Sequence, residues 1–187
     1  VLVFDDADVD AASRMLAAAK FRKAGQVCVS PTRFLIKEKV FDDFVGKFVT
    51  AASKIKVGNG LEEGTTMGPL ANTRRVTAIE AYVDDALKAG AQRKLGGSRI
   101  GEKGNFFEPT VLTHVPKEAR AMNEEPFGPL AMINPFKTFD EAIEEANRLP
   151  YGLAAYAFTR SAKTAAAVAA EVETGMMTIN HLGLALP

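Results

Sequence analysis

The chain has 187 residues, of which 47% are hydrophobic and 25% are charged, an ordinary composition for a globular protein. Its 23 Lys and Arg residues balance 23 Asp and Glu residues, so no nucleic-acid or acidic-lipid partner is expected. The single cysteine cannot form an internal disulfide, and no apolar run reaches about 18 residues. We therefore expect a reduced thiol, a cytoplasmic location and no membrane span.

Helical and strand-like patterns alternate along the chain. In chain order they predict a strand at 1–4, a helix at 9–19, a strand at 32–36, helices at 40–55 and 76–87, a short or edge strand within 106–115, a strand at 130–136, a helix at 138–146, a strand at 153–158, a helix at 161–171 and a strand at 176–180. Asp8, Thr138 and Ser161 can each cap the helix that follows. Glycine-rich segments at 56–70 and 94–105 are expected to be loops. This alternation indicates βαβ units and one compact α/β domain with a parallel sheet.

Cys28 lies in the break between a predicted helix and a predicted strand. A free cysteine commonly packs as a small hydrophobic residue, and that interpretation stays open. Loops carried by a rigid sheet are also common places for reactive groups. Cationic side chains that would favour a thiolate lie nearby in the sequence, at Lys20, Arg22, Lys23 and Arg33.

Other residues allow further interpretations. A cysteine hydrolase would need a histidine base, and the chain has only His114 and His181, neither of which the sequence places near Cys28. His114 is expected to be a loop residue without a chemical role. The segment 58–64 has glycine spacing that suggests a dinucleotide loop, but it follows a helix instead of a strand and is expected to be a surface loop. No residues have metal-ligand spacing, so no metal is expected.

Five segments, in the same order, resemble the NAD(P)-dependent aldehyde dehydrogenase superfamily. They are VFDDADVDAA at 3–12, GQVCVSPTR at 25–33, NFFEPTVL at 105–112, EEPFGP at 124–129 and PYGLAAYAFT at 150–159. The resemblance implies that residues 1–187 form the three-layer α/β catalytic domain of that family. Most of the dinucleotide-binding domain, the glutamate base and the oxyanion-hole asparagine would precede Val1. Both ends of the chain look cut, so we expect a fragment of a longer homodimeric or homotetrameric enzyme.

The resemblance also implies roles for particular residues. Cys28 would attack an aldehyde, its backbone N–H would help to hold the oxyanion, and NAD or NADP would accept hydride before water hydrolyses a thioester. Glu125 would accept hydrogen bonds from the nicotinamide ribose, and Phe127 would pack near the nicotinamide ring. Without the resemblance, Glu124 and Glu125 would be a solvated pair and Phe127 a core residue.

Substrate choice and turnover leave alternatives open. His181 lies where the family lines the aldehyde entrance, and it could favour a carboxylated substrate such as a semialdehyde; a surface histidine is the other interpretation. The string INHLGLALP loosely resembles the succinate-semialdehyde branch. Arg75 could reach the cofactor by family position, although the residue type departs from the common pattern. Because the base would lie outside the chain, the fragment alone is expected to be inactive, and a folded binding or scaffold domain is the alternative function.

Overall fold

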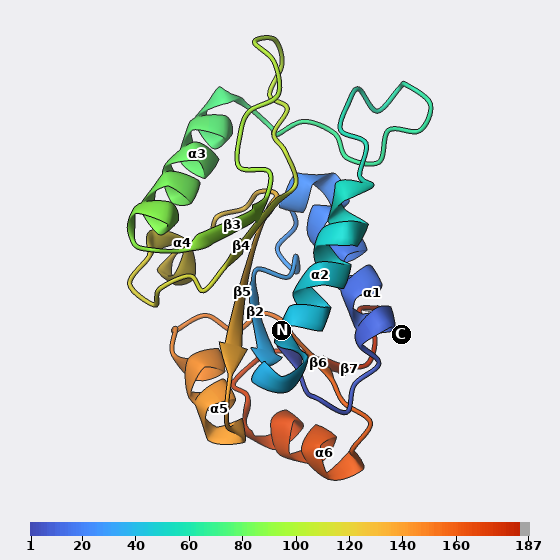
Figure 1. Ribbon diagram of the computed structural model, residues 1–187, viewed down its shortest axis with the longest axis vertical. Coiled ribbons are helices and arrows are strands. Elements are labelled where there is room, and N and C mark those ends of the chain that lie inside the picture. The colour runs from blue at the N-terminus through green and yellow to red at the C-terminus, as the bar shows by residue number, and fades with distance from the viewer. Residues whose placement is uncertain (184–187) are drawn as a thin grey trace.

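The computed structural model describes residues 1–183 and contains one seven-stranded sheet in the order β3-β4-β5-β2-β1-β6-β7 (Figure 1). Its strands are β1 (Leu2–Val3), β2 (Arg33–Lys37), β3 (Gln92–Leu95), β4 (Thr110–Thr113), β5 (Leu130–Phe136), β6 (Ala155–Phe158) and β7 (Met177–Ile179). Neighbouring strands pair in parallel except for β3 and β4, which pair antiparallel. The prediction of an α/β fold with a mainly parallel sheet is confirmed.

Helices connect most of the strands. They are α1 (Val9–Phe21), α2 (Phe41–Ser53), α3 (Thr73–Lys88), α4 (Arg120–Asn123), α5 (Phe139–Asn147) and α6 (Ala162–Glu171), with short 3₁₀ turns η1 (Arg22–Gly25) and η2 (Glu38–Val40). The three predicted caps are confirmed, because the side chains of Asp8, Thr138 and Ser161 each accept a hydrogen bond from the backbone N–H three residues later. No helix within residues 1–183 is long and apolar enough to cross a membrane.

The central strands separate two apolar layers because successive side chains point to opposite faces of a sheet. Val3 and Phe34 pack with buried residues of α1 and α2, which lie side by side (Figure 1). Leu2 and Leu35 point the other way and pack with Ala142 of α5 and with α6. The predicted three-layer arrangement therefore follows from two short strands that are buried on both faces.

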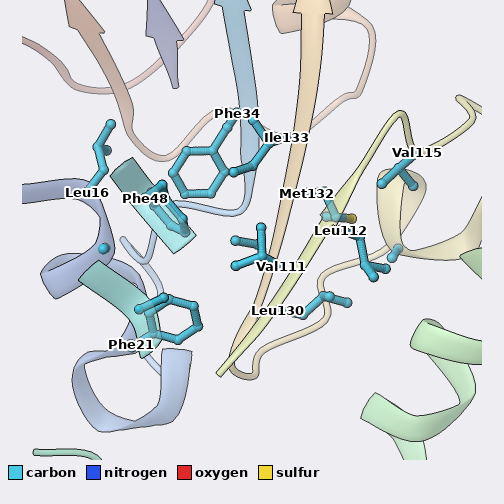
Figure 2. Packing of buried hydrophobic residues seen from close by; sticks show 14 of the residues in the cluster. Leu16, Phe21, Phe34, Phe48, Val111, Leu112, Val115, Leu130, Met132 and Ile133 are labelled. Carbon is cyan, nitrogen blue, oxygen red and sulfur yellow. The ribbon is translucent and has the colours of Figure 1, made fainter. Parts of the chain in front are cut away.

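Aromatic packing centres on Phe48 of α2, which is fully buried. Its ring centroid lies 5.3 Å from that of Phe34, 5.7 Å from Phe44 and 6.1 Å from Phe21. Figure 2 shows this group beside the buried side chains of β4 and β5. The cluster joins α1, α2 and β2, and it therefore fixes the two elements that flank the segment containing Cys28.

Two local predictions differ from the structure. Residues 92–95 form the edge strand β3, although 94–105 is predicted to be a loop. The strand has the sequence QRKL with three exposed residues, so it lacks the apolar alternation that indicates a strand. The predicted strand within 106–115 is short but is not an edge, since β4 is fully buried between β3 and β5. Pro109 precedes it and removes no ladder hydrogen bond.

We expect Phe48→Ala to lower the free energy of unfolding by about 3–5 kcal/mol, because it opens a cavity among three other rings. Leu61→Ala is the control: Leu61 is 94% exposed, and its truncation should change stability by no more than about 0.5 kcal/mol. Urea unfolding followed by circular dichroism measures both. Equal losses for the two variants would show that the aromatic cluster contributes no more than a surface side chain.

Candidate active site

A cavity of about 610 Å³ lies at the amino ends of the parallel strands. Its walls are the segments that lead into β1, β2, β5, β6 and β7, including residues 28–33, 121–125 and 151–156. The volume is within the range of sites for small molecules and cofactors. Open α/β sheets usually bind ligands at the carboxyl ends of their strands, so this location is at the opposite edge.

Cys28 lies at the tip of a turn that opens into this cavity. The Ser30 N–H donates to the Val27 carbonyl at 2.9 Å, which makes Cys28 the second residue of a four-residue turn. The thiol is exposed and lines the cavity. The Cys28 N–H donates to no acceptor within residues 1–183. The interpretation of Cys28 as a core residue is therefore wrong, and both its sulfur and its N–H face solvent or ligand.

Two side chains hold the turn from outside it. The Gln26 amide donates to the carbonyl of Pro69 at 3.3 Å and accepts from the N–H of Ala71 at 2.8 Å. On the other side, the hydroxyl of the buried Tyr156 donates to the carbonyl of Val29 at 2.6 Å. These bonds join the turn to the segment before α3 and to β6, so the position of the thiol is defined by distant parts of the chain.

The backbone before the turn is left-handed over three residues. Lys23, Ala24 and Gly25 have φ angles of 51°, 54° and 70°, a conformation that costs side-chain-bearing residues free energy. This run brings Gly25 directly against Gly128 of the EEPFGP segment. A Cβ atom added at Gly25 would lie 2.1 Å from the carbonyl oxygen of Gly128. The thiol segment and the EEPFGP segment therefore meet backbone to backbone.

The two glutamates of EEPFGP have different environments. Glu124 accepts hydrogen bonds from Arg120 and from the Tyr82 hydroxyl. Both interactions lower the pKa of Glu124, and the interaction with Arg120 has the larger effect. Glu125 is exposed and lines the cavity with Cys28, and it has no hydrogen-bond or ion-pair partner within residues 1–183. Glu124 is also exposed and lines the cavity, but its carboxylate is already bonded, whereas that of Glu125 is available to a ligand.

Phe127 lies in the same segment but does not line the cavity among the described residues. It is half-buried with a φ of 48°, an uncommon conformation for an aromatic residue. Arg75 donates from Nη2 to the Pro126 carbonyl just before it, and its buried Nε has no partner among residues 1–183. Arg75 therefore supports the turn that carries Phe127 and Glu125.

The four cations near Cys28 in sequence have different environments. Arg33 forms an ion pair with the buried Glu145 at 2.9 Å. Lys20 is only 1% exposed, and burial lowers its pKa to about 7, while the charge of Glu125 opposes this shift. Arg22 and Lys23 are exposed. Arg33 lines the same cavity as Cys28, although its charge is paired with that of Glu145, and the locally basic environment of the thiol stays a prediction.

Neither histidine lines the cavity within the described residues. His181 is exposed after β7, and its carbonyl accepts from the Thr178 hydroxyl at 2.6 Å. His114 is exposed and makes an edge contact with Phe41. The geometry thus gives no support to a Cys–His hydrolase. Part of the INHLGLALP string, residues 184–187, lies outside the described residues.

The sequence placed Lys20 among the cations near Cys28 but did not show that its side chain is buried, and it did not single out Tyr156. One signal was present for Lys20: it lies four residues after Leu16, on the buried face of α1, where a lysine is unusual. Tyr156 gave no such signal, because it is one apolar residue in a buried strand. Within residues 1–183, no group of three or more His, Cys, Asp or Glu side chains could hold a metal ion.

The residues at the cavity fit the ribose end of a nicotinamide dinucleotide. The carboxylate of Glu125 is unpaired among the described residues, and a carboxylate is an acceptor that suits two hydroxyl donors. An exposed thiol shares the cavity with that carboxylate. This fold and this arrangement define an α/β domain in which a cysteine and an unpaired carboxylate, among the described residues, face one cavity.

Comparison with known proteins gives the family. Residues 1–185 match the aldehyde dehydrogenase family, and the chain belongs to it. It is 44% identical over 180 residues to a mitochondrial succinate-semialdehyde dehydrogenase of Oryza sativa and 44% identical over 179 residues to a glutarate-semialdehyde dehydrogenase of Pseudomonas putida. These alignments cover 96% of this chain but 34% and 37% of the relatives, so the chain spans little more than a third of their length.

Solved structures agree in fold. A succinate-semialdehyde dehydrogenase from Burkholderia pseudomallei superposes with a TM-score of 0.96 at 43% identity, covering 98% of this chain and 38% of that one. A betaine aldehyde dehydrogenase from Staphylococcus aureus, solved in complex with NAD+, superposes with a TM-score of 0.93 at 36% identity, covering 98% of this chain and 37% of that one. The resemblance predicted from the five motifs is confirmed.

We expect Gly25→Ala to lower stability by more than about 2 kcal/mol, because the new Cβ meets the Gly128 carbonyl and the φ is left-handed. Gly46→Ala is the matched control, since its Cβ would meet nothing within 4 Å inside α2, and it should stabilise by about 0.5–1 kcal/mol. Thermal unfolding of both variants measures the contrast. A Gly25→Ala protein as stable as the parent would disprove the close backbone contact.

Proposed function

We propose that the full-length protein containing this chain is an NAD(P)-dependent aldehyde dehydrogenase that forms a covalent intermediate on Cys28. One observation carries the proposal: an exposed thiol at the tip of a turn shares a cavity with the Glu125 carboxylate, and within residues 1–183 neither the Cys28 N–H nor that carboxylate has a partner. Membership of the aldehyde dehydrogenase family supports it. The product is a carboxylic acid.

Cys28 acts first as a nucleophile. Its thiolate adds to the aldehyde carbon, the carbonyl π electrons move to oxygen, and a thiohemiacetal forms. The Cys28 N–H donates to the developing oxyanion, because it belongs to the nucleophilic residue itself and has no acceptor within residues 1–183. Bonds from Gln26 and Tyr156 hold the turn, so little backbone ordering remains when the substrate arrives.

Glu125 binds the cofactor next to the thiol by accepting hydrogen bonds from the ribose hydroxyls. The family resemblance gives Phe127, on the same turn, the role of limiting the position of the nicotinamide ring, although Phe127 does not line the cavity within residues 1–183. Bound NAD or NADP supplies an acceptor for the hydride that leaves the thiohemiacetal carbon. Water then cleaves the thioester on Cys28, releasing the acid and the thiol. The base for this last step, by family resemblance, belongs to a segment before Val1.

A semialdehyde is the proposed substrate class. Two of the relatives with 44% identity are named for succinate semialdehyde and glutarate semialdehyde. Both compounds carry a carboxylate at the end opposite the aldehyde. His181, exposed beyond β7, is the proposed basic group that favours such a substrate. The preference between NAD and NADP belongs to the dinucleotide-binding domain.

Replacing Cys28 by Ser should lower the rate of reduced-cofactor formation by at least about a thousandfold, because a serine hydroxyl is hardly ionised at neutral pH. The assay measures absorbance of NADH or NADPH with succinate semialdehyde, using the full-length protein. Cofactor binding by calorimetry should be unchanged in the variant, which shows that the site remains folded.

Turnover by the Cys28→Ser protein at the parent rate would exclude a covalent role for the thiol. A parent protein that binds the cofactor but oxidises no aldehyde would favour the scaffold alternative. Ester hydrolysis that requires Cys28, in a parent protein that oxidises no aldehyde with either cofactor, would favour the hydrolase.

His181→Ala should raise the KM for succinate semialdehyde by about fivefold, since a charge-assisted contact contributes roughly 1 kcal/mol or more. The KM for a neutral aldehyde of similar length, such as butanal, should stay within about twofold. Equal losses for both aldehydes would show that His181 does not recognise the carboxylate.

A further inference from the structure

A buried carboxylate near the cavity has no part in the proposed mechanism. Glu145 lies in α5 and is only 5% exposed. Arg33 donates to one of its carboxylate oxygens at 2.9 Å, and Arg148 donates to the other at 2.9 Å. Lys117 approaches the same carboxylate at 3.5 Å, with 59% of its side chain exposed. Glu145 is therefore a bridge between two guanidinium groups.

The two arginines also bind groups beyond the carboxylate. Arg148 donates to the Met122 carbonyl at 3.1 Å and to the side-chain oxygen of Asn123 at 2.7 Å. Arg33 donates to the backbone carbonyl of Glu145 at 2.9 Å. A continuous chain of charge-assisted hydrogen bonds therefore runs from the start of β2, through α5, to the end of α4.

Two segments carry the proposed reacting groups, and they meet at one pair of ends. We call residues 25–33 the thiol segment, because it contains Cys28, and residues 122–128 the carboxylate segment, because it contains Glu125. The glycine that begins the first segment and the glycine that ends the second lie backbone to backbone. One end of each segment is thus fixed against the other.

The Glu145 bridge joins the other pair of ends. Arg33 ends the thiol segment, and Met122 begins the carboxylate segment. Arg33 binds the Glu145 carboxylate, which binds Arg148, which in turn binds the Met122 carbonyl. The proposed nucleophile and the proposed cofactor ligand therefore lie between two fixed points and not on two independent loops.

The chemistry of the bridge suits positioning better than stabilisation. Desolvation of buried charges offsets much of their attraction, and apolar side chains of similar size can often fill the same space without a loss of stability. A guanidinium fork, by contrast, fixes the direction of each hydrogen bond that it donates. Reacting groups need such fixed geometry, because a misplacement of about 1 Å can slow a reaction by roughly a hundredfold.

We propose that Glu145 is a positioning residue, which holds the thiol segment and the carboxylate segment at the separation that the reaction needs. This inference rests on the proposed function, because these segments carry the proposed nucleophile and the proposed cofactor ligand. Glu145 acts only through its two arginines. Its loss should therefore slow the chemical step, which needs both segments, and should leave cofactor binding to the carboxylate segment unchanged.

The test compares two variants of the full-length protein with the parent. Glu145→Gln keeps the shape of the side chain but loses its charge, and Arg148→Lys keeps the cationic charge but loses the fork. With cofactor and succinate semialdehyde saturating, each should lower kcat by about tenfold, counted per Cys28 thiol that iodoacetamide alkylates. The cofactor Kd, measured by calorimetry, should stay within about twofold, because the Glu125 carboxylate remains available.

Lys117→Met is the matched control. Lys117 contacts the same carboxylate, but its ammonium binds neither segment within residues 1–183, so kcat should stay within about twofold of the parent value. A purely structural role of the bridge gives a different result in Glu145→Gln. It would lower the melting temperature and the amount of folded protein, and it would leave the kcat per alkylated thiol unchanged.

Hydrogen exchange provides a readout that needs no turnover. In the thiol segment the Ser30 N–H donates to the Val27 carbonyl at 2.9 Å, and in the carboxylate segment the Glu124 N–H donates to the Arg120 carbonyl at 2.8 Å. Both amides should exchange at least about threefold faster in Glu145→Gln, because one pair of segment ends is released. Amides of α2, which lies outside both segments, should exchange at the parent rate.

The outcomes separate this inference from the proposed function. If Cys28→Ser turns over at the parent rate, or if the parent oxidises no aldehyde, the proposed function is wrong, and hydrogen exchange alone decides whether the bridge holds the segments. If Cys28→Ser is inactive but either folded variant keeps its kcat per thiol within about twofold, the positioning role is overturned. Unchanged exchange in the two segments also overturns it. Should Glu145→Gln not fold, Arg148→Lys decides by the same measurements.

Discussion

The close approach of Gly25 to Gly128 is the constraint on which the site depends. It leaves no space for a side chain at Gly25, and it joins two segments separated by about a hundred residues in sequence. The three residues that lead to this contact, Lys23 to Gly25, have left-handed backbone conformations. Cys28, in the thiol turn, lies three residues after Gly25. Glu125 lies three residues before Gly128, so the contact places a thiol and a carboxylate on one cavity. Backbone strain of this kind persists only where surrounding contacts over-determine it, and here Gln26, Tyr156 and Arg75 provide them.

The location of the cavity explains why loops supply its chemistry. Parallel strands buried on both faces leave only their ends for polar groups, and the segments entering β2 and β5 carry the thiol and the carboxylate. The rigid sheet and the Phe48 cluster hold the starting points of these loops. The same packing that stabilises the domain thus sets the geometry of the reacting groups.

Regular elements were predictable from sequence because their apolar spacing is a local property. The caps at Asp8, Thr138 and Ser161 were found for the same reason. The strand β3 was missed because its exposed polar residues carry no alternation. In the site, Cys28 and Glu125 were found through family motifs, whereas the bond from Tyr156 to Val29 spans 127 residues and has no local signature. The ion pair between Arg33 and Glu145 spans 112 residues, and it could not be predicted for the same reason: it has no local sequence signature.

In the proposed reaction, the Cys28 sulfur bonds covalently to the carbonyl carbon of the substrate. This bond can be detected by mass spectrometry of peptides from the full-length protein, quenched in acid during steady oxidation of succinate semialdehyde. We expect a succinyl mass increase on the peptide that contains Cys28, which disappears after the substrate is exhausted. Continued formation of reduced cofactor with the acyl group on another residue, or with none on Cys28 at any time of quenching, would contradict it.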